Sequence, residues 1–138
     1  MLVEAHEEAV GAAVGYLERE ACRVRRGHNG TKAERERGDP RGWEHARCEP
    51  APGFVAAGYR HRMSRAQDPQ LHTHVVAANM AQGADGRWTA LDARHIYEHA
   101  KAGRAVYQAH LRQAVRERLP WASWEPVRNR RAHPVRLA

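Results

Sequence analysis

Apolar residues near the start of the chain recur at intervals of three and four, which is the spacing of one face of an α-helix. The stripe lies within residues 3–24 and consists of Val10, Ala13, Val14, Leu17 and Ala21. Glutamate and arginine side chains gather on the other face. The pattern therefore predicts an amphipathic helix over residues 3–24 that packs on a sheet.

The apolar period is lost between residues 25 and 52. Glycine, arginine and glutamate are frequent in this stretch, and residues 34–49 show no apolar repeat. Such a composition favours a solvated loop, within which Asn29-Gly30 is typical of a short hairpin turn. We predict a mobile basic loop over residues 25–52.

Residues 53–80 change to a period of two and predict a pair of strands. The first strand ends at His61, and the second covers residues 71–78. Residues 64–70 connect them, with Asp68-Pro69 as the turn signal. The apolar run of residues 75–78 indicates a central strand that is buried on at least one side.

The last part of the chain predicts a hairpin, a second long helix and an extended tail. Residues 84–86 form the turn, residues 87–91 return as a strand, and Asp92 caps a helix that ends near residue 119. Prolines in residues 120–138 exclude a long helix there. The elements predict an α+β fold, with an antiparallel sheet of about three to five strands flanked by two long helices, in one domain over residues 1–138.

Three histidines are the strongest candidates for chemistry in this framework. His72 and His74 share one face of their strand, and His61 faces them if the two strands pair antiparallel. Three neutral imidazoles from two adjacent strands make a divalent metal site with open positions for water or a phosphate oxygen. The alternative is a solvated or hydrogen-bonded strand face that binds no metal.

The string His61-Arg-Met-Ser-Arg-Ala-Gln-Asp-Pro-Gln-Leu-His72-Thr-His74-Val-Val-Ala-Ala-Asn also carries a resemblance. It is similar to the histidine-triad segment of the conjugative relaxases of the MobF group, the TrwC/TraI type of HUH endonuclease. The likeness continues through Asp85-Gly-Arg-Trp-Thr-Ala-Leu-Asp92 and Tyr107-Gln-Ala-His-Leu-Arg, and begins upstream at Ala5-His-Glu-Glu-Ala-Val10. It covers residues 4–119.

The resemblance implies a function in plasmid transfer. Relaxases of this type nick single-stranded DNA at a transfer origin and form a phosphotyrosine link, while a divalent ion such as Mg²⁺, Mn²⁺ or Zn²⁺ polarises the scissile phosphate. By resemblance, the ion's ligands are His61, His72 and His74. The family's nucleophilic tyrosines lie in the first half of the domain, so this sequence resembles the back half of an incomplete relaxase domain. We therefore expect no catalytic tyrosine here, no activity of the chain alone, and a separate polypeptide as a possible source of the first half.

Two other functions stay open from the residues. One is a non-enzymatic, basic DNA-binding remnant whose triad still takes metal. The other is a cupin-like metal enzyme, because cupin barrels also carry His-x-His on a strand. Against the cupin hypothesis, Ala78 and Asn79 stand where that pattern requires a glutamate.

Several residues near the triad are candidates for supporting roles. Arg62 and Arg65 lie in the connection between the strands and are candidates for DNA phosphate binding. Asp68 is a candidate second-shell partner of an imidazole, or else only a turn former. The motif His95-x-x-Glu98-His99 fits the inverted zincin pattern but lacks the context of such peptidases.

Charge and composition agree with a DNA-binding protein. The net charge of +7 and the pI near 10.2 favour an anionic partner. No hydrophobic run predicts a membrane span, and the first residues lack a signal-peptide pattern, so we expect a cytoplasmic protein. Two cysteines, Cys22 and Cys48, are too few for a disulfide framework.

Overall fold

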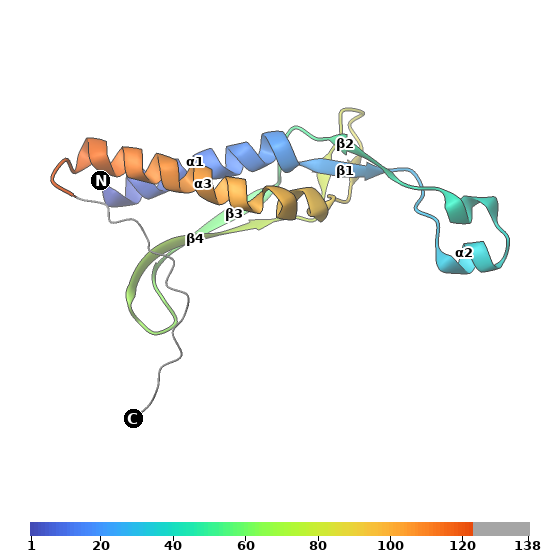
Figure 1. The fold of residues 1–138 in the computed structure, drawn as a ribbon, viewed down its shortest axis with the longest axis horizontal. Coiled ribbons are helices and arrows are strands. Elements are labelled where there is room, and N and C mark those ends of the chain that lie inside the picture. The colour runs from blue at the N-terminus through green and yellow to red at the C-terminus, as the bar shows by residue number, and fades with distance from the viewer. Residues whose placement is uncertain (123–138) are drawn as a thin grey trace, which may run out of the picture.

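The computed structural model describes residues 1–122 and has the predicted α+β architecture. Helices α1 (Leu2–Ala21) and α3 (Ala93–Arg118) run antiparallel and lie side by side, with the hairpin of strands β3 (Ala56–Met63) and β4 (Pro69–Ala77) beneath them (Figure 1). A narrow ribbon extends beyond the helices toward a small helical tip. Of the predicted tail, residues 123–138 lie outside the described part of the chain.

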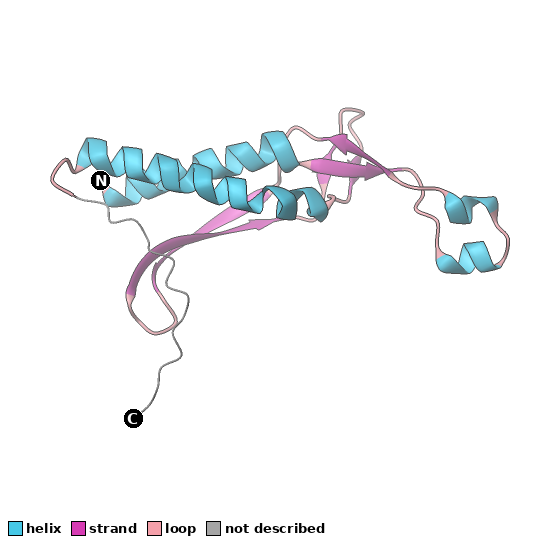
Figure 2. Ribbon diagram, in the orientation of Figure 1, coloured by secondary structure: helices cyan, strands magenta, loops and turns pink. Residues whose placement is uncertain are grey.

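Within residues 1–122, the strands form three separate two-stranded antiparallel sheets, not the single larger sheet that the sequence predicts (Figure 2). One of these sheets is the β3–β4 hairpin. The remaining elements are β1 (Arg23–Arg26), α2 (Lys32–Glu36), η1 (Pro40–Trp43), β2 (Arg47–Pro50), β5 (Ala81–Gln82) and β6 (Trp88–Thr89). The predicted turn at residues 84–86 joins β5 to β6, and Gly86 adopts φ +77° there.

Residues 25–52 form strands and short helices where the sequence predicts a loop. This stretch contains half of β1 together with α2, η1 and β2, and β1 pairs with β2 in register from Arg23 opposite Pro50 to Arg26 opposite Arg47. Helix α1 also ends at Ala21, three residues before the predicted end, because the chain there becomes extended. Only Val24 of β1 is buried, since its neighbours are arginines, and a single apolar residue gives no readable period.

The core is divided into two small clusters at opposite ends of the helix pair. One cluster contains Cys22, Val24, Ala51, Ala81 and Leu91, and the other contains Ala5, Ala114 and Val115. Between them, the middle of α1, the middle of α3 and one face of β4 enclose an apolar groove of about 630 Å³. The predicted stripe of α1 lines this groove with Val10, Ala13, Val14 and Leu17.

Strand β4 is not a central strand within the described residues. It pairs with β3 on one side only. Val75 lines the apolar groove under the helices and is 43% exposed, and Val76, on the opposite face, is 59% exposed. The hairpin therefore presents one face to the helices and the other face to solvent.

Candidate metal centre

The three predicted histidines come together on the solvent-facing side of the β3–β4 hairpin. His61 stands directly opposite His72, and Tyr59 stands opposite His74, in the antiparallel register that the sequence predicts. The imidazole ring centres are 5.2 Å apart between His61 and His72, and 5.0 Å apart for each of the other two pairs. Period-two geometry on two paired strands is sufficient to produce this arrangement.

The spacing of the rings fits a common metal ion. Three imidazole nitrogens bound at about 2.0–2.1 Å to one tetrahedral ion place their ring centres about 5 Å apart. Ligation needs the nitrogens to meet at one point, which would require the rings to rotate about the last side-chain torsion. His61 and His74 are exposed, so their rings have room to turn.

The orientation of one imidazole is already fixed. Nδ1 of His72 lies 3.0 Å from the main-chain oxygen of Gln70. A carbonyl oxygen only accepts, so Nδ1 carries the proton and Nε2 keeps its lone pair for a metal. Sequence reasoning proposed Asp68 for such a role, but for His72 the main chain of Gln70 supplies it.

Side chains on the opposite face of the hairpin tie it to the helices. His6 of α1, which is only 3% exposed, places Nε2 at 2.8 Å from the hydroxyl of Thr73 and Nδ1 at 2.9 Å from the hydroxyl of Tyr107 on α3. Arg60 of β3 also forms an ion pair with Glu7 of α1. Thr73 lies between His72 and His74 along the strand, so these contacts fix the segment that carries the triad.

His6 was not identified from the sequence as a site residue, although a signal was present. It lies four residues before Val10 on the apolar stripe, where a polar residue needs a buried partner. Burial lowers its pKa, an effect that Arg60 and His72 reinforce and Glu7 opposes. The imidazole is therefore neutral near pH 7, with one nitrogen donating and the other accepting.

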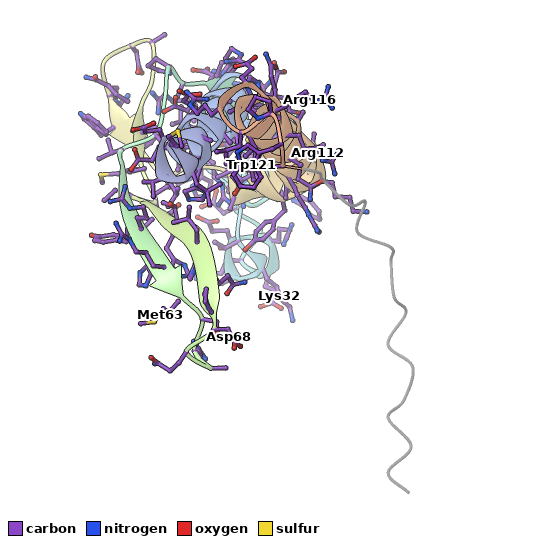
Figure 3. The ribbon with its side chains drawn as sticks, turned by 90° about the vertical axis from the view of Figure 1, so that its left-hand side faces the viewer. Lys32, Met63, Asp68, Arg112, Arg116 and Trp121 are labelled. Atoms are coloured by element: carbon purple, nitrogen blue, oxygen red, sulfur yellow. The ribbon has the colours of Figure 1, made fainter. Side chains whose placement is uncertain are left out.

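The candidate phosphate ligands lie at the end of the hairpin beyond the triad. A bulge interrupts the pairing between His61 and Met63, which places Arg62 at the irregularity. Ser64 closes the turn, because its main-chain N–H donates to the oxygen of Asp68 at 2.9 Å. Arg62, Arg65 and Asp68 are all exposed. Figure 3 shows Asp68 and Met63 at the free end of the β3–β4 hairpin, away from helices α1 and α3.

Only one of the four tyrosines lies on the triad face. Tyr59 is 56% exposed and stands opposite His74. Tyr16 is hydrogen-bonded to Nδ1 of His99 at 2.8 Å, Tyr107 is bonded to His6, and Tyr97 is on α3. No other tyrosine of this chain contributes to the candidate centre.

The His95-x-x-Glu98-His99 motif does not form the metal site of an inverted zincin. His99 is hydrogen-bonded to Tyr16 of α1, whereas Nδ1 of His95 lies 3.3 Å from a carboxylate oxygen of Glu98. The two histidines are thus engaged with different partners. This agrees with the sequence argument that the motif lacks its required context.

A second group of ligand-type side chains lies at the start of α3. Cys48, Asp92 and His95 each offer one potential ligand atom, and these three atoms lie within 4.8 Å of one another. Asp92 is fully buried, caps α3 as predicted, and accepts from the Cys48 thiol at 2.8 Å. Hydrogen bonds from Arg94, and then from Cys48, hold the pKa of Asp92 far below its usual range, while the bond to Asp92 and burial raise the pKa of Cys48. Both cysteines are free thiols.

A two-stranded hairpin that places three histidine rings 5.0–5.2 Å apart, beneath two antiparallel helices, defines an α+β protein with a histidine triad. The chain belongs to the TrwC relaxase family, whose model matches residues 1–135. This confirms the resemblance to the TrwC/TraI type and makes the cupin hypothesis wrong. The histidine-bearing strand pairs with one neighbour under helices, instead of closing into a barrel.

Solved structures and a curated relative agree with this assignment. The conjugative relaxase TrwC in a metal-free complex with oriT DNA superposes with a TM-score of 0.68 at 30% identity, over 83% of this chain and 35% of that chain. A copper-bound TrwC complex with oriT DNA gives 0.69 at 30% identity, over 84% and 34%. The multifunctional conjugation protein TraI of Escherichia coli is 42% identical over an alignment of 71 positions, and this alignment covers 45% of this chain and 4% of TraI. This chain thus spans about a third of the TrwC chains and a small part of TraI.

No helix in residues 1–122 combines the length and the apolar character that crossing a bilayer requires.

Proposed function

We propose that this chain is the metal-binding part of a relaxase that acts on single-stranded DNA at a transfer origin. The observation that carries the proposal is the meeting of His61, His72 and His74 on one exposed face of the β3–β4 hairpin. Support comes from TrwC, which has been solved in complex with oriT DNA both with and without metal. We place this activity in the cytoplasm, where plasmid DNA is processed.

His61, His72 and His74 would hold a divalent ion, of which Mg²⁺, Mn²⁺ and Zn²⁺ are the candidates. When bound, the ion supplies a Lewis acid that polarises a phosphate oxygen and helps to position the DNA strand. A three-histidine site accepts several divalent metals, so availability decides which one is bound. The carbonyl of Gln70 keeps Nε2 of His72 free for this role.

The protein groups around the triad would bind and orient the DNA. Arg62 and Arg65 are exposed at the open end of the hairpin and can form charge-assisted hydrogen bonds with phosphate oxygens. Tyr59 presents its ring on the triad face, where an unpaired base can stack on it. Asp68 would shape the turn and remains a candidate partner of the triad.

The attacking tyrosine would come from outside this chain. Tyr16 and Tyr107 are held by histidines on the helices, Tyr97 lies near the start of α3, and Tyr59 is part of the strand that presents the triad. We therefore propose that the chain alone does not nick DNA and that a polypeptide with the first part of the relaxase domain completes the reaction. The DNA-binding remnant is the alternative outcome of the tests below.

The deciding experiment is a calorimetric titration of the full chain with Mn²⁺ and Zn²⁺. A His61→Ala/His72→Ala/His74→Ala variant serves as the comparison, with circular dichroism to verify its helices. Because Zn²⁺ can also bind thiols, the proposal is judged on Mn²⁺, for which we expect one equivalent that the variant loses. Equal Mn²⁺ binding by both proteins, or none by the folded parent, would contradict the proposal.

A second experiment tests the DNA part separately. The chain is mixed with a labelled single-stranded transfer-origin oligonucleotide, with and without the first part of a relaxase domain, at two salt concentrations. We expect salt-dependent binding by the chain alone and nicking only when both parts are present. Binding without nicking in the completed mixture would favour the DNA-binding remnant.

A further inference from the structure

The cluster of Cys48, Asp92 and His95 lies apart from the histidine triad, at the junction of β2 with the start of α3. We propose that it is a second metal site, which binds a borderline-soft ion of the zinc class. Its potential ligand atoms already lie within 4.8 Å of one another. The three side chains come from β2, from the cap of α3 and from the first turn of α3, so an ion there joins two elements that are distant in sequence.

The fold holds these side chains in place before any ion is bound. Strand β1 pairs with β2 along one edge and with residues 90–92 along the other. On that second edge, Val24 bridges to Leu91, and the main-chain N–H of Asp92 donates to the oxygen of Arg23 at 2.8 Å. Strand β1 therefore fixes β2 and the start of α3 relative to each other.

The donor set matches zinc better than it matches magnesium or calcium. Thiolate, imidazole and carboxylate are the three ligand types of zinc sites, whereas Mg²⁺ and Ca²⁺ take oxygen ligands almost exclusively. The Cys48 thiol now donates to Oδ2 of Asp92 at 2.8 Å. An ion would take the place of that proton, so that an S–metal bond forms as the S–H bond breaks and one proton is released to solvent.

Neighbouring groups orient two of the three ligands. Nδ1 of His95 lies 3.3 Å from a carboxylate oxygen of Glu98, which leaves Nε2 to face an ion. Arg94 holds Asp92 through both oxygens, with Nη2 at 2.7 Å from Oδ2 and Nε at 3.1 Å from Oδ1. Carboxylate partners on ligating histidines and hydrogen bonds on ligating carboxylates are the usual outer contacts of zinc sites.

A polar cavity on the Cys48 side of the cluster has room for a fourth ligand. Cys48 borders a cavity of about 520 Å³ whose wall also includes Asn29, His45, Arg25 and Arg94. A water in this cavity can complete the coordination. The two arginines repel a cation, so we expect the affinity to rise with salt, which screens them.

The test is a Co²⁺ titration of the full chain in the His61→Ala/His72→Ala/His74→Ala background, followed by ultraviolet and visible absorption. Co²⁺ reports on zinc sites because a cobalt–thiolate bond gives a charge-transfer band that imidazoles cannot produce. We expect this band to saturate at one equivalent, with release of one proton for each ion bound. Added Zn²⁺ should displace the cobalt and remove the band.

Matched variants identify the thiol. Cys48→Ser should abolish the band, whereas Cys22→Ala, which alters the other thiol in the core, should retain it. His95→Ala leaves the Asp92 cap intact and should weaken Co²⁺ binding at least tenfold. No band in the folded parent, a band that survives Cys48→Ser, or unchanged affinity in His95→Ala would each overturn the proposal.

Discussion

Replacement of His6 by alanine tests how the metal-binding hairpin is fixed beneath the helices. The buried imidazole joins α1 to Thr73 of β4 at 2.8 Å and to Tyr107 of α3 at 2.9 Å. Alanine removes both hydrogen bonds, leaves two hydroxyl groups beside a cavity and removes the packing of the ring. At about 1 kcal/mol for each hydrogen bond, plus the cavity and the unpaired hydroxyls, we expect the free energy of unfolding to fall by about 2–4 kcal/mol.

The same contact predicts a pH dependence. Burial lowers the pKa of His6 in the folded chain, whereas in the unfolded chain the value stays near 6.5. The unfolded state therefore binds more protons as the pH falls below about 6.5, and the stabilising effect of the neutral imidazole is lost there. One such group contributes at most about 1.4 kcal/mol per pH unit. In His6→Ala, the free energy of unfolding should lose this part of its dependence on pH.

The assay is urea unfolding at about pH 7.5 and about pH 5.5, on either side of the ordinary histidine pKa. A cycle with Thr73→Val measures the coupling of the two side chains, which we expect to be about 1 kcal/mol. Glu7→Gln is the matched control, because it breaks the exposed ion pair with Arg60 and should cost less than about 1 kcal/mol. A His6→Ala chain with parental stability and parental pH slope would refute the reasoning.

Three further predictions address other elements. An added Cβ at Gly103 of α3 would meet side-chain atoms of Leu17 at 3.4 Å, an ordinary contact distance. Gly103→Ala should therefore raise the free energy of unfolding by about 0.5–1 kcal/mol through its higher helix propensity, whereas the larger side chain of Gly103→Leu should lower it by about 1–3 kcal/mol. The midpoints of denaturant unfolding measure both effects. Thr31→Ala removes the hydroxyl contacts of the α2 capping box and should raise the pKa of Glu34 from about 2 only part of the way toward 4.5, because the main-chain N–H of residue 31 and His28 still donate to the carboxylate; NMR titration reads this shift. In the parent, the lowered pKa stabilises the α2 segment above pH 4.5, and this stabilisation is lost as the pH falls toward 2. Tyr59→Phe should leave Mn²⁺ binding unchanged and should not abolish nicking by a completed domain, and a complete loss of nicking would identify Tyr59 as the nucleophile.

The sequence predicted those parts of the fold in which local pattern decides the structure. The antiparallel pairing that unites the histidines follows from period two and a turn signal, and Asp92 is recognisable as a cap because it precedes a helical stripe. The α+β class follows from the same patterns. None of these inferences needed information about distant contacts.

The features that the sequence did not predict depend on contacts that the local sequence does not encode. Strand β1 is recognised only through its pairing with β2 and with Leu91, because its one buried valine stands among three arginines and shows no apolar period. The role of His6 depends on hydroxyl groups 67 and 101 residues away. The meeting of Cys48 with Asp92 likewise requires β1 to hold β2 beside the start of α3. Each of these features is a property of the tertiary structure.

The two faces of the β3–β4 hairpin explain why the candidate centre is both fixed and accessible. Alternate residues of β4 serve different purposes: Thr73 contacts His6 and Val75 lines the groove under the helices, while His72 and His74 carry the triad at the positions between and beside them. A slip of one residue in the pairing would turn the histidines toward the helices and expose the anchoring side chains. The turn closed by Ser64, which accepts from the main-chain N–H groups of residues 66 and 68, fixes the register against such a slip. Ser64→Ala should therefore weaken Mn²⁺ binding although Ser64 is no ligand, and an unchanged affinity would show that the strands set the register by themselves.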